Sequence, residues 1–224
     1  MDAALKSCEL FKGISEIEIE KCLACCGGKV ISFEKNEAVF HQTAKPQNLY
    51  ILIKGAVAVC HDATSGKRTV VTTICRSGDL FGEVYLFLNR DAYDYYALAV
   101  ENTKVLKMPK AFFYEQCEKG CGFHARLIQN MLTILATKAH FLTRKVQLLS
   151  SASLRQKIVK ALLQFAGPDG SVRLNMNREE MADYIGAARP SLSRELMRMQ
   201  EDGLIAVKGK KISIIDMAEL ENCV

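Results

Sequence analysis

The sequence predicts an α+β protein, because three stretches of the chain follow three different hydrophobic patterns. Residues 29–107 are a series of short β-rich runs separated by Gly, Asn and Asp, which favours a closed β-barrel or roll. Residues 122–149 carry an unbroken apolar heptad repeat, which predicts a long helix. Residues 177–215 combine two short amphipathic helices with a basic hairpin. We therefore expect a β-roll, a long helix and a small C-terminal domain, in this order.

The composition fits a folded chain with two cores and sets few limits on its partners. Of the 224 residues, 49% are hydrophobic and 25% are charged, and the formal net charge is +5. No signal peptide follows Met1, and no apolar run approaches the ~18 residues that cross a bilayer, so we expect a cytoplasmic protein without a membrane partner. The nine cysteines lack the spacing of a disulfide framework, which also fits a reducing compartment.

The first expected element is a helix that precedes the roll. Ser15 with Glu18 forms a capping box, and the helix runs to about Cys26. The runs Leu49–Ile53 and Ala56–Cys60 are typical of the strands that follow. Because helices do not alternate with these strands, a parallel α/β sheet is not expected.

The long helix is expected to join two copies of the chain. Its apolar positions are spaced by four and three residues in turn over three heptads, which is typical of a parallel coiled coil. Packing of this helix on its own domain is the alternative interpretation. Ser150–Ser153 breaks the pattern and predicts a hinge. The residues assigned to dimerisation are Ile128, Leu132, Leu135, Ala139, Leu142, Val146 and Leu149.

A helix-turn-helix pattern follows the hinge. Asn177 caps a short helix, Gly186-Ala187-Ala188 forms a tight turn, and Pro190 suits the first turn of a second helix. The inward-facing stripe of this second helix consists of Leu192, Leu196 and Met199. With the basic hairpin that comes next, these features predict a winged helix-turn-helix.

The outer face of the second helix and the hairpin predict DNA binding. Arg189 and Arg194 suit bidentate contacts to guanine in the major groove, and basic or hydroxyl side chains around them suit phosphate contacts. The alternative is an ordinary helical hairpin whose arginines are merely solvated. The residues assigned to DNA contacts are Arg178, Arg189, Ser191, Ser193, Arg194, Arg198, Lys208 and Lys210.

Three local motifs carry a resemblance that covers essentially the whole chain. They are Asn48–Val57, Ser77–Glu83 and Ala188–Glu195. In this order and spacing they resemble the CRP/FNR family of bacterial transcription regulators. The resemblance implies a double-stranded β-helix (a cupin-like jelly roll of the cyclic-nucleotide-binding type) in residues 1–120, a dimerisation helix in residues 121–149 and a winged helix-turn-helix in residues 150–224. Pro190 departs from the Glu that the family often has between its two base-reading arginines.

The sensing half departs from the family's cyclic-nucleotide-binding members. Those members hold the cyclic phosphate with an Arg-Ser or Arg-Thr pair downstream of the Gly-Glu, where this chain has Tyr93-Asp94. Asp94 would repel a phosphate, and Arg90 could replace the missing arginine only after a register shift of three residues. Cyclic AMP is therefore not the expected ligand. One candidate is a small aromatic or anionic organic effector in the roll. By resemblance, its binding residues are Phe81, Gly82, Glu83, Tyr85, Tyr93, Asp94, Tyr95 and Lys138.

Three other sensing chemistries remain open, so the cofactor is unknown at this point. An iron–sulfur cluster needs four thiolates. Cys22, Cys25 and Cys26 lie in the expected first helix, and Cys117 with Cys121 forms a further i, i+4 pair. Thiol redox switching would use the same cysteines, whereas buried structural cysteines would sense nothing. Haem would need an axial ligand, for which the chain offers Cys75, His41, His61, His124 and His140.

A ligand-gated, homodimeric transcription regulator is the expected function. It predicts a two-fold symmetric DNA operator with half-sites one DNA turn apart, about 34 Å, and RNA polymerase as a further partner. A cysteine-dependent enzyme is the rival class. The chain has no nucleophile elbow, P-loop, HExxH or paired-carboxylate motif, so no enzyme is expected. The third class is a constitutive DNA-binding protein whose roll senses nothing.

Overall fold

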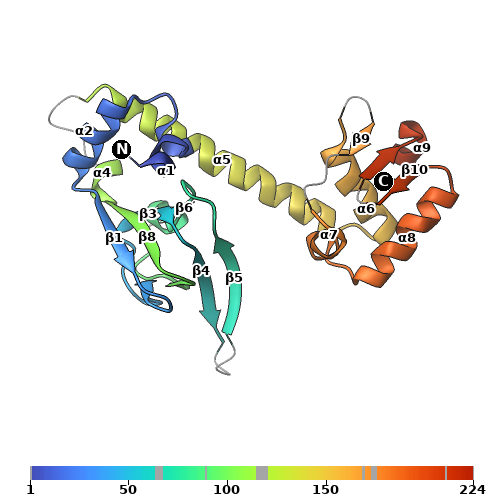
Figure 1. Ribbon diagram of the computed structural model, residues 1–224, viewed down its shortest axis with the longest axis horizontal. Coiled ribbons are helices and arrows are strands. Elements are labelled where there is room, and N and C mark those ends of the chain that lie inside the picture. The colour runs from blue at the N-terminus through green and yellow to red at the C-terminus, as the bar shows by residue number, and fades with distance from the viewer. Residues whose placement is uncertain are drawn as a thin grey trace. The chain divides into compact units, whose positions relative to one another are not determined.

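The computed structural model describes residues 2–63, 68–88, 90–114, 121–167, 170–172, 176–209 and 211–223. The chain divides into two compact units, Met1–Thr137 and Lys138–Val224 (Figure 1). The boundary falls inside the long helix α5 (Phe123–Leu149), whose first half therefore belongs with the first unit and whose second half belongs with the second. The finer division at residues 120 and 149 stays a prediction. Within the described residues, no helix combines the length and the apolar character that a membrane crossing requires.

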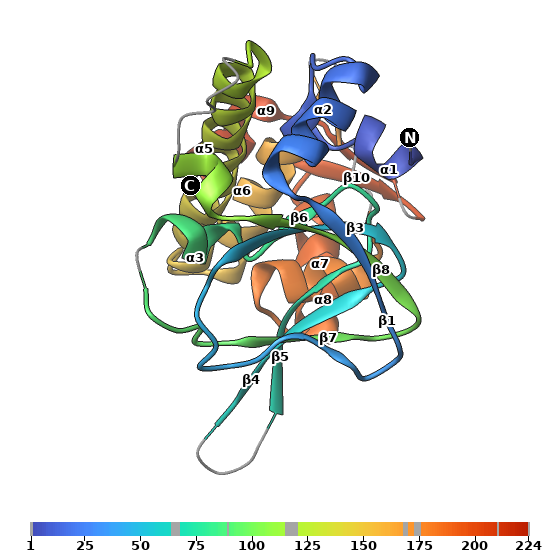
Figure 2. The same ribbon diagram turned by 90° about the vertical axis from the view of Figure 1, so that its left-hand side faces the viewer.

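Two four-stranded antiparallel sheets form the roll of the first unit, as the α+β prediction requires. One sheet has the order β1-β8-β3-β6, with β1 (Lys29–Phe33), β8 (Thr103–Pro109), β3 (Asn48–Lys54) and β6 (Leu80–Phe81). The other has the order β2-β7-β4-β5, with β2 (Ala38–Phe40), β7 (Tyr96–Ala99), β4 (Val57–Asp62) and β5 (Arg68–Ile74). Figure 2 shows the strands curving around the interior of the roll, with β4 and β5 extending beyond the others.

Strand β3 is covered on both faces, which explains its continuous apolar run. Because side chains alternate along a strand, Tyr50 and Leu52 point to one face and Leu49, Ile51 and Ile53 to the other. The first pair belongs to a cluster inside the roll. The other three belong to a second cluster, to which helices on the outside of the sheet contribute. Those helices are α1 (Ala3–Lys6), α2 (Glu16–Cys26), α4 (Ala111–Tyr114) and the start of α5.

Local capping explains where the helices of the first unit begin and end. Ser15 and Glu18 form the capping box predicted for α2, and Gly27 ends the helix in the left-handed conformation. Gly82, at φ +78°, precedes the short helix α3 (Glu83–Phe87). A Cβ on Gly82 would lie 3.1 Å from Cδ2 of Tyr50, so both the backbone angle and the close ring favour glycine there.

Helix α5 has the bounds that the heptad pattern predicted, but its apolar residues have different environments. Leu127 and Met131 are buried in the cluster of the first unit, and Ile128 and Leu135 pack partly against it. The alternative of packing on its own domain therefore holds for the first half of the helix. The heptad positions that remain exposed are Leu132, Ala139, Leu142, Val146 and Leu149.

The second unit contains the expected winged helix-turn-helix. Its helices are α6 (Leu154–Phe165), α7 (Arg178–Ile185), α8 (Arg189–Glu201) and α9 (Met217–Asn222), and its antiparallel sheet has the order β10-β11-β9. The strands are β9 (Ser171–Val172), β10 (Ile205–Lys208) and β11 (Lys211–Ile214). Asn177 with Glu180 forms the predicted capping box, and Gly186 ends α7 at φ +65°. The predicted stripe of α8 is fully buried in the core of this unit.

Candidate functional site

The exposed face of α8 is fixed by its buried face. Leu192, Leu196 and Met199 pack into the core, so the positions between them face away from it. Arg189, Arg194 and Arg198 are exposed, as predicted, while Ser191 and Ser193 are half-buried. The Nε of Arg194 donates to the carbonyl oxygen of Pro190 over 3.4 Å, which orients this side chain along its own helix. The geometry places hydrogen-bond donors on one helix surface, from Arg189 in the first turn to Arg198 in the last.

Arg189 lies at the first position of α8 and faces a carboxylate of α7. Its Nη1 is 3.9 Å from Oε2 of Glu179, and both side chains are mostly exposed. An exposed ion pair of this length contributes little stability. Arg189 therefore keeps a guanidinium that an external acceptor can bind.

Glu195 and Arg155 form a structural ion pair that the sequence did not reveal. The Nε of Arg155 is 2.6 Å from Oε1 of Glu195, and its Nη1 is 2.7 Å from Oδ2 of Asp202. Only 14% of the Glu195 side chain is exposed. This network holds α6 against both the middle and the end of α8. It also reaches Arg198, whose Nη1 is 3.6 Å from Oε2 of Glu195, so Arg198 is less available for DNA than Arg194.

A groove of about 330 Å³ separates α8 from the wing. Gln200 bridges the two elements, because its Oε1 accepts a hydrogen bond of 2.8 Å from the backbone N–H of Val207. Burial lowers the pKa of Arg178, which begins α7 at the edge of this groove. The exposed Lys208 ends β10, whereas Lys210 lies outside the described residues. The groove is lined by Arg178, Ser193, Leu196, Met197, Gln200, Val207 and Gly209.

Sequence reasoning missed Met197 and Gln200 in this groove. Met197 is 63% exposed, unlike the other apolar residues of α8. The sequence could have predicted this exposure, because Met197 does not lie on the helical stripe of Leu192, Leu196 and Met199. The Gln200–Val207 contact joins a helix to a strand across a turn, and no local pattern indicates it.

The interior of the roll is filled by aromatic rings. The Tyr93 ring stacks on Phe40 with centroids 4.1 Å apart, and Tyr85 meets Tyr93 edge-on at 5.0 Å. Tyr50 stacks on Phe81 at 5.3 Å and on Phe40 at 5.5 Å. Phe40 and Tyr50 were not among the predicted site residues. The alternation of β3 could have indicated Tyr50, because it shares a face with Leu52.

The tyrosine hydroxyls of this cluster have raised pKa values. Burial, and then the negative charge of Asp94, raise the pKa of Tyr85 to about 12. Its hydroxyl donates to Oδ2 of the exposed Asp94 over 3.4 Å. Burial also raises the pKa of Tyr93, with the nearby Tyr50 hydroxyl as a further cause. Among the described residues, no hydrogen-bond partner is found for the buried Tyr93 hydroxyl.

The other predicted effector residues are spread around these rings. Glu83 is only 3% exposed, and Tyr95 meets Tyr85 edge-on at 6.3 Å. The structure therefore brings Phe81, Tyr85, Tyr93 and Tyr95 into one aromatic group, with Asp94 bonded at its edge. Lys138 belongs to the second unit, and its membership of the site stays a prediction.

The alternative of a metal cluster has no formed site in the part of the chain described above, whereas the haem alternative stays a prediction. No group of three or more His, Cys, Asp and Glu side chains is placed there to hold a metal ion. Cys22 and Cys26, predicted to share a helix face, are both buried in the cluster beside α2. Cys117 lies outside the described residues.

Comparison with known proteins matches both units. Residues 30–119 match the cyclic nucleotide-binding domain, and residues 156–223 match the Crp-like helix-turn-helix domain. The chain is 24% identical over 189 residues to a cAMP-activated global transcriptional regulator CRP of Pasteurella multocida, covering 81% of this chain and 88% of that one. It is 26% identical over 193 residues to a global nitrogen regulator of Nostoc, covering 83% and 84%.

Solved structures show the same fold. The catabolite activator protein of Thermus thermophilus superposes with a TM-score of 0.51 at 22% identity, covering 96% of this chain and 97% of that one. DNR from Pseudomonas aeruginosa gives a TM-score of 0.51 at 22% identity, covering 98% and 95%.

Proposed function

Because the chain belongs to the CRP/FNR family of bacterial transcription regulators, we propose that it is a homodimeric, sequence-specific DNA-binding protein gated by a small molecule in its β-roll. Members of this family combine an effector-binding domain with a helix-turn-helix domain, bind DNA and act as dimers; they are regulators and not enzymes. The effector, the dimer and the residues of each site are the proposed part.

The observation that carries the proposal is the division of α8 into two faces. Its apolar stripe is buried, and its exposed side carries Arg189 and Arg194 at the N-terminal end. An exposed guanidinium on a helix of this length can bind O6 and N7 of guanine in the major groove. Lys208 at the wing and Arg178 at the start of α7 supply phosphate contacts.

The dimer is supported by the exposed apolar positions of α5. Leu132, Leu142 and Val146 are each more than 60% exposed in the single chain. Such residues at a and d positions are buried when two copies pair in parallel. Pairing sets the two α8 helices about one DNA turn apart, which gives the operator its two-fold symmetry.

The effector is proposed to be a small aromatic molecule with a polar group, and not a cyclic nucleotide. The rings of Phe40, Tyr50, Phe81 and Tyr93 offer flat faces for stacking. The buried hydroxyls of Tyr93 and Tyr50 lie close together and offer polar groups that a ligand could bind. The Asp94 carboxylate lies at the edge of this group and disfavours a phosphate.

The DNA part is tested by selecting operators from a random duplex pool and measuring affinity by fluorescence anisotropy. Arg194→Ala is expected to weaken binding to the selected operator about 5- to 100-fold and to relax the preference at one base pair per half-site. Arg76→Ala removes an exposed arginine of the first unit and serves as the matched control. Binding that shows no sequence preference in the wild-type protein would overturn the proposal.

A further inference from the structure

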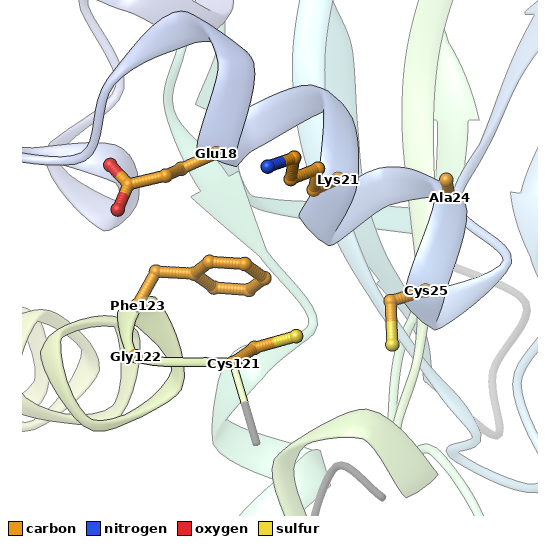
Figure 3. A pocket seen from close by; sticks show the side chains of 7 residues that line it. All are labelled: Glu18, Lys21, Ala24, Cys25, Cys121, Gly122 and Phe123. Carbon is orange, nitrogen blue, oxygen red and sulfur yellow. The ribbon is translucent and has the colours of Figure 1, made fainter. Parts of the chain in front are cut away.

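A second cavity lies outside the roll and brings two thiols together. It has a volume of about 500 Å³ and lies between α2 and the start of α5, both in the first unit. Figure 3 shows the sulfur atoms of Cys25 and Cys121 pointing toward each other across it. Both side chains are half-buried, so they are shielded from bulk solvent but open to a small molecule that enters the cavity. The cavity is lined by Glu18, Lys21, Ala24, Cys25, Cys121, Gly122 and Phe123.

One side of this cavity carries the charged side chains of Glu18 and Lys21. The Glu18 carboxylate is bound by the backbone N–H of Ser15 at 2.8 Å and by its hydroxyl at 2.7 Å, so its charge is engaged in the helix cap. The Lys21 side chain lines the same cavity, and a cation beside a thiol favours the nucleophilic thiolate.

The buried cysteines nearby differ from this pair. Cys22 is fully buried, and its hydrogen bond to Cys26, followed by burial, raises the pKa of its thiol. Burial also raises the pKa of Cys8 to about 11. These thiols stay protonated at neutral pH and lie out of reach of a solute. Exposure to the cavity therefore singles out Cys25 and Cys121.

We propose that Cys25 and Cys121 form a peroxide-reactive thiol pair that closes to a disulfide and so links α2 to the start of α5. In the first step, one thiolate attacks a peroxide oxygen; the O–O bond breaks, an S–O bond forms, and hydroxide leaves and takes a proton as water. In the second step, the other sulfur attacks the sulfenic acid; the S–O bond breaks, the S–S bond forms and a second water leaves. The two thiols together lose two electrons, and hydrogen peroxide gains them. This site does not depend on the effector or on DNA binding.

The test treats the reduced full-length protein with equimolar hydrogen peroxide and maps its peptides by mass spectrometry without reduction. The wild-type protein is expected to give one dominant cross-linked pair, Cys25 with Cys121. Before oxidation, iodoacetamide is expected to label these two thiols about tenfold faster than Cys22 and Cys8. Cys75→Ser, which removes an exposed cysteine, is the matched control and is expected to cross-link as the wild type does.

Serine variants separate the two steps. Cys25→Ser and Cys121→Ser are each expected to abolish the cross-link and to leave the remaining cysteine as a sulfenic acid, which dimedone traps. The proposal is overturned if Cys25 and Cys121 both remain alkylatable after peroxide treatment, or if the dominant disulfide uses another pair. It is also overturned if anaerobically purified protein contains iron and sulfide that are lost in Cys25→Ser, because the thiols then serve a cluster.

Discussion

The ammonium of Lys145 lies 3.8 Å from the centroid of the Tyr184 ring and also donates to the Tyr184 backbone carbonyl. Tyr184 in turn donates through its hydroxyl to Oε1 of Gln164 over 3.1 Å. One turn later on α5, Leu149 packs so close to Gly186 that a Cβ there would lie 3.2 Å from its Cδ2. The last turns of α5 therefore contact α7 and the turn that leads to α8. Within this unit, a displacement of α5 acts directly on the helix-turn-helix as well as through the Ser150–Ser153 segment.

Lys145→Met is expected to destabilise the second unit by about 1–2 kcal/mol, because it removes a cation–π contact and a hydrogen bond while keeping the aliphatic stem. Burial lowers the pKa of Lys145, which shows that part of this gain is offset by desolvation of its charge. Urea unfolding followed by circular dichroism measures the change. Lys211→Met, at an exposed position of β11, is the control and should leave the free energy of unfolding within about 0.5 kcal/mol of the wild type.

Val146→Glu is expected to raise the dissociation constant of the proposed dimer at least about 100-fold, since it places a charge at a position that pairing would bury in both copies. Val146 is 62% exposed in the single chain, and Val70 on β5 is 55% exposed. Val70→Glu is therefore a control of matched exposure that lies outside the heptad positions. Analytical ultracentrifugation distinguishes the two variants. Equal sedimentation of Val146→Glu and wild type would contradict the assignment of this helix to dimerisation.

The raised pKa of Tyr85 predicts a loss of stability at high pH. Its folded pKa of about 12 exceeds the ordinary 10.0, so the protonated hydroxyl stabilises the folded state. This contribution is complete below pH 10 and is lost as the pH rises to about 12. Asp94→Asn removes a negative charge that raises the pKa and should lower the ionisation midpoint of Tyr85. Ultraviolet titration of the folded protein, with Tyr85→Phe to identify the signal, measures both values.

Gly55→Ala is expected to destabilise the roll by about 2–4 kcal/mol, because it adds both a backbone penalty and a clash. Gly55 has φ +94°, and a Cβ there would lie 2.5 Å from Oγ1 of Thr103 and 2.8 Å from the carbonyl oxygen of Asn102. Gly27→Ala, at φ +65° with nothing within 4 Å, isolates the backbone penalty of about 1 kcal/mol. Thermal unfolding of the two variants compares them, and an equal loss in both would show that the loop around Asn102 yields to the added methyl group.

Features that depend on near neighbours in the chain were predictable from the sequence. The capping boxes at Ser15 and Asn177 form as expected, because the side chain and the N–H it binds are three residues apart. The bounds of α5 and the buried stripe of α8 also follow from spacing alone.

Contacts between distant residues were not predictable in this way. Arg155 meets Glu195 across 40 positions, and Phe40 meets Tyr93 only after the strands have paired. The heptad pattern gave no sign that the first half of α5 packs on the first unit, because one apolar residue suits a partner helix and a domain core equally well. The sequence also did not show which tyrosines line the roll, because this depends on strand register. A one-residue shift in register would exchange the inward-facing and outward-facing side chains.

The two-sided burial of β3 ties the contents of the roll to the position of α5. Tyr50 stacks on Phe40 and Phe81 on one face, while Leu49 and Ile51 on the other face share a cluster with Leu127 and Met131 of α5. Interiors packed at this density do not absorb a shift locally. A displacement of the β3 backbone at Tyr50 would also shift Leu49 and Ile51, which share a cluster with Leu127 and Met131 of the long helix. In the function proposed above, this single strand would be the shared wall between the ligand and the helix, and no lid or hinged loop would be needed to connect them.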